Sequence, residues 1–205
     1  MSNTPGVVLV FAHGAGAGQS HPFMTSWNAR LSTLGTVHAF EYPYMAAGSR
    51  RPDRMPTLLA AHREARRAAR ELAGSDAQVF LIGKSMGSRV GCHLANEADI
   101  TVAGVMCFGY PLVGSSKKRP VRDAVLKELE TPVLFIQGTR DKLCPLDHLA
   151  EVRAEMSAKT ELHVVETGDH SLQTTKTFQK TTGVSQADSD AAMFVAIETF
   201  VRALS

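Results

Sequence analysis

Residues 78–87 of the chain, QVFLIGKSMG, decide its fold. The apolar run at 78–82 predicts a β-strand covered on both faces, and the residues from Ser85 to Glu97 predict a helix. Gly83 lies between them, so the strand passes into the helix through a tight turn. This strand–turn–helix unit is the building block of alternating α/β folds.

The same alternation continues on both sides of this stretch. Five further apolar runs bounded by turn residues predict strands at 6–12, 36–41, 102–108, 132–137 and 161–166. Four further stretches predict helices at 55–73, 121–129, 146–156 and 188–204. Because such units assemble into right-handed βαβ crossovers, we predict an α/β fold, a three-layer α/β/α sandwich with a mostly parallel sheet of about six strands.

Length and composition limit the class of protein. The 205 residues predict a single domain over 1–205 that buries a core without disulfides. A net charge of +2 and 44% hydrophobic residues exclude a disordered chain and a globally basic nucleic-acid coat protein. The three cysteines are far apart, which excludes a zinc knuckle. With no signal peptide or membrane-spanning run visible, we expect a soluble cytoplasmic protein that binds neither nucleic acid nor membrane.

The pentapeptide GKSMG at 83–87 matches the G-x-S-x-G pattern of serine nucleophiles. A serine hydroxyl is a poor nucleophile unless a sharp turn projects it towards a base, and the flanking glycines leave room for such a turn. A helix beginning after Ser85 directs the Met86 N–H and the helix dipole towards a developing oxyanion. We predict Ser85 as the nucleophile and Met86 as an oxyanion donor. The alternative is a strand–helix turn without chemistry.

Two other glycine motifs are incomplete. A phosphate-binding P-loop ending at 83–85 needs a glycine at position 78, where Gln78 lies inside a predicted strand. A dinucleotide-binding turn at 14–19 needs its third glycine at the position of Gln19. We therefore expect no cofactor and no metal ion.

The glycine-rich stretch HGAGAG at 13–18 follows the first predicted strand directly. Glycines let backbone N–H groups face a substrate carbonyl with no side chain between them, as in the His-Gly loops of esterases. We predict that Ala15 or Gly16 supplies a second oxyanion donor beside Met86. An ordinary flexible loop is the alternative.

An acid and a histidine follow later strands in the order that a serine hydrolase needs. The strand at 132–137 is followed by GTRD, which ends at Asp141, and the strand at 161–166 is followed by GDH, which ends at His170. Both loops should lie at the same sheet edge as Ser85. We predict Asp141 as the acid that orients His170, and His170 as the base. Asp169 and Glu166 are second choices for the acid.

The other histidines fit the role of base less well. His38 and His163 lie inside predicted strands, where they would be core or face residues. His62 lies among charged residues of a helix and is predicted to be solvated, while His93 and His148 lie within or near the start of helices.

Five segments together resemble the α/β-hydrolase superfamily: VFAHGAGAG, LIGKSMGSRV, GYPL, PVLFIQGTRDKL and ETGDHSL, between positions 10 and 172. The chain is similar in particular to the small family that includes the testis-expressed hydrolase-like protein and the hydrolase-like part of a nonspecific-lethal complex subunit, near the dienelactone hydrolases. The resemblance implies Ser85, Asp141 and His170 as nucleophile, acid and base, and implies no substrate. It also implies a sheet that lacks the superfamily's first two strands. The polar stretch 173–189 departs from the superfamily pattern and is expected to be a mobile flap or a plain surface loop.

These residues predict a serine hydrolase that cleaves a small-molecule carboxylic ester or thioester through an acyl-enzyme on Ser85. Lys84, Tyr44 and Tyr110 are candidate substrate-binding residues. A non-catalytic interaction module with the same fold and a cofactor-free perhydrolase remain alternatives. Only 21 positions, 111–131, separate the fourth and fifth predicted strands, which leaves no room for a cap domain. We therefore expect a minimal fold with a shallow, open site.

Two loops expected at the site edge are basic. The stretch 42–54 has three arginines, Arg50, Arg51 and Arg54, against Asp53, and the stretch 110–122 has Lys117, Lys118, Arg119 and Arg122 with no acid. Such a field attracts anions, so an anionic substrate is one hypothesis. A solvated basic surface is the other. The sequence does not predict an oligomeric state.

Overall fold

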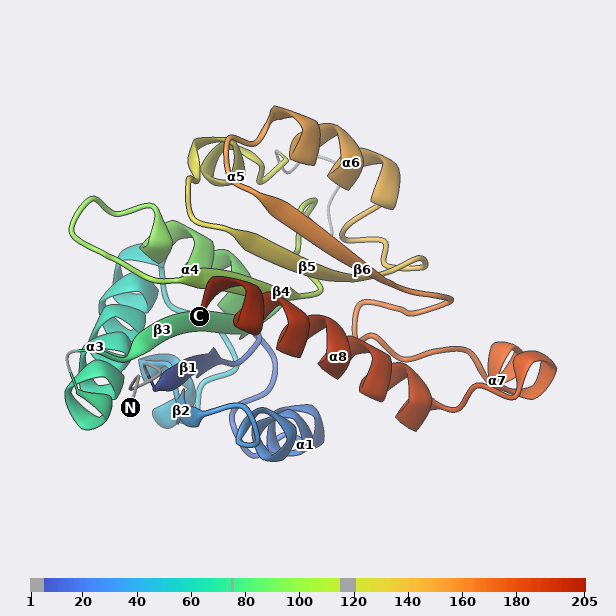
Figure 1. Ribbon diagram of the computed structural model, residues 1–205, viewed down its shortest axis with the longest axis horizontal. Coiled ribbons are helices and arrows are strands. Elements are labelled where there is room, and N and C mark those ends of the chain that lie inside the picture. Colours follow the sequence, from blue (N-terminus) through green and yellow to red (C-terminus); the bar gives the residue numbers. More distant parts are fainter. Residues whose placement is uncertain (1–5, 75, 115–120) are drawn as a thin grey trace.

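The apolar runs form one parallel sheet with the strand order β2-β1-β3-β4-β5-β6 (Figure 1). The computed structural model describes residues 6–74, 76–114 and 121–205. Within these ranges every neighbouring pair of strands is parallel, so the predicted sheet of about six strands is confirmed. The strands are β1 Val7–Ala12, β2 Thr36–Phe40, β3 Gln78–Lys84, β4 Gly104–Phe108, β5 Val133–Gly138 and β6 Thr160–Val165.

Helices connect the strands, and five of them match predicted stretches. These are α3 Met55–Ala73, α4 Met86–Ala95, α5 Ala124–Glu128, α6 Leu146–Glu155 and α8 Gln186–Leu204. Three further helices were not predicted: α1 Pro22–Leu31, α2 Pro43–Ala46 and α7 Lys176–Thr182. None of the helices in the described ranges is both long and apolar enough to span a bilayer.

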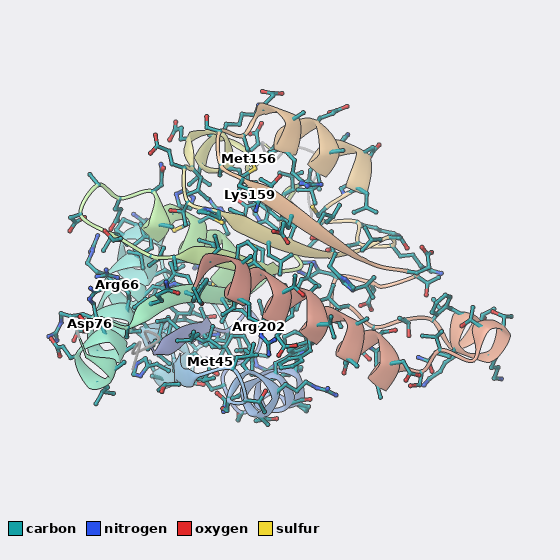
Figure 2. The ribbon with its side chains drawn as sticks, viewed as in Figure 1. Met45, Arg66, Asp76, Met156, Lys159 and Arg202 are labelled. Carbon is teal, nitrogen blue, oxygen red and sulfur yellow. The ribbon has the colours of Figure 1, made fainter. Side chains whose placement is uncertain are left out.

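The two faces of the sheet bury separate cores, which makes the molecule three-layered. Because side chains alternate along a strand, Val8 and Val10 of β1 face one layer while Leu9 and Phe11 face the other. The first layer comprises α3, α4, α5 and α6, and the second comprises α1 and α8 (Figure 1). Figure 2 draws the side chains that fill these layers. The predicted α/β/α sandwich without a cap domain is confirmed.

The stretch 173–189 is not a plain surface loop. It contains α7, which extends beyond one end of the sheet and buries no side chain, and the first turn of α8 (Figure 1). Thr175 caps α7 by accepting from Phe178 N, and Ser185 caps α8 through a capping box with Asp188. The polar composition that predicted a loop reflects helices capped by side chains and exposed to solvent.

The chain order places the loop after β1 and the turn after β3 at one edge of the sheet. β1 lies between β2 and β3, so the chain reverses its direction of travel across the sheet at this point. In such sheets ligands bind at the carboxyl ends of the strands where the order reverses. Ala12 pairs with Gly83 in register, which brings the loop after β1 beside the turn after β3.

Gly83 allows α4 to pack directly on β3. A methyl group added at Gly83 would lie 2.2 Å from Ser88 N and 2.3 Å from Gly87 C, both backbone atoms that have no flexible end to move. Similarly, a methyl at Gly87 would lie 2.5 Å from Ala12 O. These glycines are required for close backbone approach.

The variant Gly83→Ala should therefore lose about 3 kcal/mol of unfolding free energy in urea denaturation, because the backbone must shift to admit the methyl group. The matched control is Gly6→Ala, at a position where an added methyl meets nothing within 4 Å. The control should change stability by about 0.5 kcal/mol or less. Equal effects of the two substitutions would contradict the packing argument.

Candidate active site

Ser85 occupies the turn between β3 and α4 in a backbone conformation that side chains rarely adopt. Its φ is 50° and its ψ is −110°. Such conformations cost about 1–3 kcal/mol and cluster at functional turns. The Ser85 N–H donates to Phe108 O at 2.9 Å, and the Ser85 carbonyl accepts from Ser88 Oγ at 2.6 Å and from Arg89 N at 3.2 Å. The structure therefore contains the sharp strand–helix turn that the motif at 83–87 predicts.

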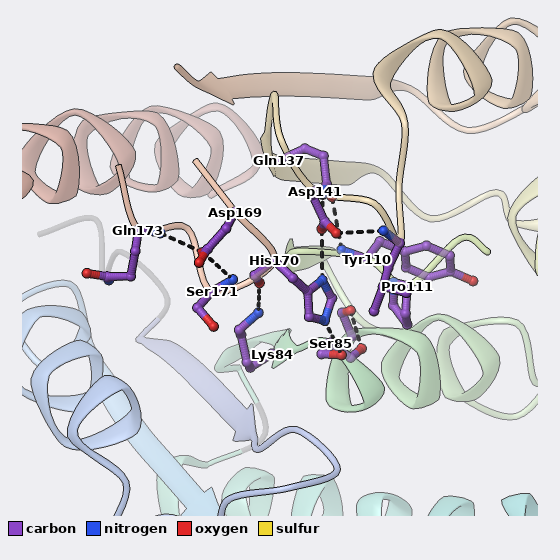
Figure 3. A network of polar contacts seen from close by, with 12 residues as sticks. Lys84, Ser85, Tyr110, Pro111, Gln137, Asp141, Asp169, His170, Ser171 and Gln173 are labelled. Carbon is purple, nitrogen blue, oxygen red and sulfur yellow. Dashed lines mark hydrogen bonds and ion pairs between the residues drawn. The ribbon is translucent and has the colours of Figure 1, made fainter. Parts of the chain in front are cut away.

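The structure brings Ser85, His170 and Asp141 into one hydrogen-bonded chain (Figure 3). His170 Nε2 lies 2.8 Å from Ser85 Oγ, and His170 Nδ1 lies 2.8 Å from Asp141 Oδ2. Asp141 follows β5 and His170 follows β6, so all three residues lie at the carboxyl edge of the sheet. The Asp141 side chain is fully buried, while that of His170 is 28% exposed. The carboxylate is thus shielded from water and the imidazole is accessible.

Asp141 is held by groups other than His170. Its Oδ1 accepts from Leu143 N at 2.8 Å and its Oδ2 from Gln137 Nε2 at 2.5 Å, and Gln137 Oε1 accepts from Tyr110 N at 3.1 Å (Figure 3). Burial by itself raises the pKa of Asp141. The hydrogen bond and charge of His170, followed by the bonds from Leu143 and Gln137, outweigh burial and lower the pKa below its usual value. The ionised carboxylate only accepts hydrogen bonds, so His170 Nδ1 carries the proton.

Asp169 is placed differently from Asp141. Its Oδ1 accepts from Ser171 N at 2.8 Å and from Gln173 N at 3.0 Å (Figure 3). These bonds stabilise the turn that follows His170. Glu166 is exposed and accepts from Thr167 N at 3.2 Å. Neither second-choice acid is hydrogen-bonded to the His170 ring.

The loop after β1 is fixed from beneath by buried aromatic side chains. His13 Nδ1 donates to Gly14 O at 2.7 Å, and His13 Nε2 accepts from Tyr42 N at 3.1 Å. This pattern requires the neutral imidazole, and burial correspondingly lowers the pKa of His13. The Tyr44 hydroxyl donates to Ala15 O at 3.0 Å and to Gly14 O at 3.3 Å.

These bonds also fix the direction of two N–H groups. In a trans peptide the N–H points opposite to the preceding carbonyl. Because the Gly14 and Ala15 carbonyls face Tyr44, the N–H groups of Ala15 and Gly16 point away from it. Ala15 and Gly16 both line the cavity that contains Ser85.

Lys84, a predicted substrate-binding residue, lines the cavity but is turned towards the loop of His170. Its ammonium group donates to the His170 carbonyl (Figure 3). Gly109, at a φ of 63°, leaves space for this contact, because a methyl there would lie 3.1 Å from Lys84 Nζ and 3.0 Å from His170 O. Burial lowers the pKa of Lys84 to about 8, although the charges of Asp141 and Asp169 act in the opposite direction.

The other two predicted substrate-binding residues are buried beneath the loops. Tyr44 is 4% exposed, and its hydroxyl donates to carbonyls of the loop after β1. Tyr110 is fully buried, and its hydroxyl donates to Arg122 O at 2.9 Å. Neither residue is among those lining the two cavities beside Ser85.

A cavity of about 710 Å³ opens on one side of Ser85. Its apolar wall comes from α1 and includes Phe23, Met24 and Trp27. This wall was not predicted from the sequence. The signal was present, because Met24, Trp27 and Leu31 recur at helical spacing after Pro22, which is favoured in the first turn of a helix. The polar part of the lining comprises Lys84, Ser85, His170, Gln173, Gln186 and Asp190 with nearby residues.

A second cavity of about 340 Å³ lies on the other side of Ser85. It shares Ser85 and Ala15 with the first cavity and contains the predicted oxyanion donor Met86. Two arginines, Arg89 and Arg122, also line it. Sequence analysis did not single out Arg89, although its position four residues after Ser85 places it one helical turn from the nucleophile.

One of the other histidines differs from its prediction. His62 is fully buried instead of solvated, and its Nδ1 lies 3.2 Å from the Tyr42 hydroxyl. Burial lowers the pKa of His62 to about 3. The prediction for His62 was wrong because His62 lies on the buried face of α3 with Leu58 and Ala65, although its neighbours in sequence are charged.

The basic edge is only partly described. Lys117, Lys118 and Arg119 lie outside the described residues. Arg50, Arg51 and Arg54 are exposed, and Arg122 Nη1 donates to Pro111 O at 3.2 Å. Within the described ranges, no three His, Cys, Asp or Glu side chains are grouped so that they could hold a metal ion.

The chain is similar to known proteins over most of its length. A family model described as "Alpha/beta hydrolase domain" matches residues 5–202. Among solved structures, an alpha-beta serine hydrolase homologue from Coxiella burnetii is similar with a TM-score of 0.66 and 17% identity over 97% of this chain and 85% of that chain. A dienelactone hydrolase from Anabaena variabilis has a TM-score of 0.66 and 18% identity over 92% of this chain and 86% of that chain. At these identities the likeness to the two structures is one of fold.

The buried amine of Lys84 should make stability depend on pH. Its pKa is lowered from 10.5 to about 8 in the folded state, so between these values the unfolded chain holds a proton that the folded chain has lost. Stability then rises with pH across this window. The unfolding free energy of the wild type minus that of Lys84→Met should increase by about 3 kcal/mol from pH 8 to 10.5. Urea denaturation at several pH values measures it, and a constant difference would contradict the burial of a titrating amine.

Proposed function

This chain belongs to the family of alpha/beta hydrolase domains, and from this premise we propose that it is a serine hydrolase that cleaves a carboxylic ester or thioester through an acyl-enzyme on Ser85. The observation that carries the proposal is the continuous hydrogen-bonded chain from Ser85 Oγ through His170 to the buried Asp141 carboxylate. A nucleophile, a base within hydrogen-bond reach and a third group that orients the base are what covalent acyl transfer requires.

Acylation begins when Ser85 Oγ attacks the substrate carbonyl carbon. His170 Nε2, at 2.8 Å, accepts the hydroxyl proton. Asp141, acting through Nδ1, keeps the ring in the tautomer that leaves Nε2 free to accept and stabilises the imidazolium that forms. The tetrahedral intermediate collapses when His170 passes this proton to the leaving oxygen or sulfur. The Ser85 ester remains.

Deacylation repeats these steps with water as the nucleophile. His170 takes a proton from water, the hydroxide attacks the Ser85 ester, and His170 returns the proton to Ser85 Oγ as the acid leaves. The acyl group gains one oxygen from water, and the enzyme is regenerated without an external oxidant or reductant.

Three N–H groups are candidates to stabilise the oxyanion. Met86 N is in the first turn of α4, where the helix dipole is positive. The N–H groups of Ala15 and Gly16 belong to a loop fixed by His13 and Tyr44 and point away from Tyr44. Donors held in place before the reaction cost no reorganisation when negative charge develops.

The cavity on the α1 side suits a small molecule. Its volume of about 710 Å³ is within the range of ligand sites, and its apolar wall with polar groups near Ser85 fits an ester whose body is apolar. We therefore propose a small-molecule ester or thioester as the substrate.

Labelling with a fluorophosphonate probe tests the nucleophile. The wild type should be labelled covalently on Ser85, whereas Ser85→Ala should not be labelled, because only a base-activated serine attacks the phosphorus at a useful rate. Gel fluorescence and mass spectrometry of the labelled peptide measure it. The control is Ser49→Ala, at a serine away from the triad, which should be labelled like the wild type. An unlabelled wild type would favour the non-catalytic interaction module.

The acid is tested by comparing Asp141→Asn with Asp169→Asn on 4-nitrophenyl butyrate. Asp141→Asn should lower kcat by about 10³-fold or more, because the amide NH2 can donate to His170 Nδ1 and so favours the tautomer with the proton on Nε2. Asp169→Asn, at a residue that only caps a turn, should lower kcat by less than about tenfold. The reverse order of effects would assign the acid to Asp169.

A further inference from the structure

Arg89 lies on the helix that Ser85 begins, four residues after the nucleophile. Its N–H donates to Ser85 O at 3.2 Å, so the two residues are stacked one turn apart. Side chains on a helix lean towards its N-terminus. The Arg89 side chain accordingly reaches the cavity of about 340 Å³ that contains Ser85 and Met86.

The Arg89 guanidinium is partly buried, and one of its nitrogens lacks a partner. Its Nε is buried and has no hydrogen-bond partner. Arg30, Arg63, Arg67 and Arg202 form ion pairs, whereas Arg89 forms none with residues 6–74, 76–114 and 121–205. An unpaired polar group in a buried position costs about 1–3 kcal/mol, and more when it is charged. A group of this kind beside a reacting serine is expected to meet its partner in a ligand.

The charges around the cavity favour a single negative charge. Arg89 and Arg122 line it together with Asp53, whose Oδ2 accepts from Tyr44 N at 3.0 Å. The formal charges of these three lining residues sum to +1, which matches a carboxylate better than a doubly charged phosphate. The remaining wall includes Met55, Leu58, Pro111 and Val113, which suit a short methylene chain.

The position of His170 separates the two ends of the substrate. His170 lines the large cavity and is not among the residues that line the small one. Because His170 must protonate the leaving group, the leaving group lies on the side of the large cavity. The acyl group then extends into the small cavity, towards Arg89.

We propose that Arg89 binds a carboxylate at the far end of the acyl group, so that the preferred substrates are half-esters or half-thioesters of dicarboxylic acids. This inference rests on the proposed serine-hydrolase function. One helical turn separates Ser85 from Arg89, a distance of roughly 6 Å along the axis. An adipoyl group, with four methylenes between its two carboxyl carbons, serves as the test acyl group.

The test compares mono-4-nitrophenyl adipate with 4-nitrophenyl hexanoate, which share a leaving group and a chain length. The measured quantity is the ratio of their kcat/KM values. Arg89→Gln should lower this ratio by about 10- to 100-fold, because the variant loses a charge-assisted hydrogen bond. Arg89→Lys should retain part of the ratio, and higher salt should lower the ratio of the wild type. Thermal unfolding of both variants shows that they are folded.

A matched arginine and a matched substrate provide the controls. Arg202→Gln, on α8 (labelled in Figure 2) at an exposed Arg202–Glu198 pair, should leave the ratio unchanged. The ester 3-carboxy-4-nitrophenyl hexanoate has its carboxylate on the leaving group, and its hydrolysis should not depend on the charge at position 89. An unchanged ratio in folded Arg89→Gln overturns the inference, as does a dependence on Arg89 confined to this third ester.

The outcomes also separate this inference from the function on which it rests. If the wild type cleaves hexanoate and Arg89→Gln keeps the wild-type ratio, only the role of Arg89 is wrong. If the wild type cleaves none of the three esters and is not labelled by a fluorophosphonate, the serine-hydrolase proposal itself fails, and the inference fails with it.

Discussion

The close approach of α4 to the ends of β1 and β3 is the constraint on which the site depends. A side chain at Gly83 would collide with Ser88 N, and one at Gly87 would collide with the Ala12 carbonyl. Because neither position has a side chain, the helix begins immediately after the strand, and Ser85 adopts a φ of 50°. The conformational cost at Ser85 is carried by backbone contacts on both sides of the turn. Ser85, the proposed nucleophile, is therefore positioned by the packing of main chains.

Close contact between main chains also positions Asp141 and His170. A methyl at Gly138 would lie 2.2 Å from Gly168 O, and Arg140 N donates to that carbonyl at 2.9 Å. The turn containing Asp141 and the loop containing His170 are thus packed backbone against backbone. A hydrogen bond from Lys84 to the His170 carbonyl connects the turn of Ser85 to the same loop. Three loops from distant parts of the chain are in this way held to one another before a substrate arrives.

The sequence predicts those parts of the molecule that local patterns encode. The motif around Ser85, the sheet and the two loops after β5 and β6 follow from apolar runs and from glycines next to them. The helix α1 was missed although Met24, Trp27 and Leu31 recur at helical spacing. The direction of Tyr44 and Tyr110 was not predictable, because it depends on what packs above them. His62 shows the same limit, since its burial depends on which face of α3 contacts the sheet.

Lys84 and Arg89, two basic residues close to Ser85 in the sequence, differ in the partners of their side chains. Lys84 is buried, but its ammonium group has the His170 carbonyl as a partner and the charges of Asp141 and Asp169 nearby. It is satisfied within the protein, so its contribution is to hold the loop of the base. Arg89 Nε is buried as well but has no partner. A buried polar atom without a partner destabilises the protein, and under the proposed specificity a substrate carboxylate would supply the partner that Arg89 Nε lacks. The large cavity thus selects by shape and apolar surface, while the small cavity selects by charge.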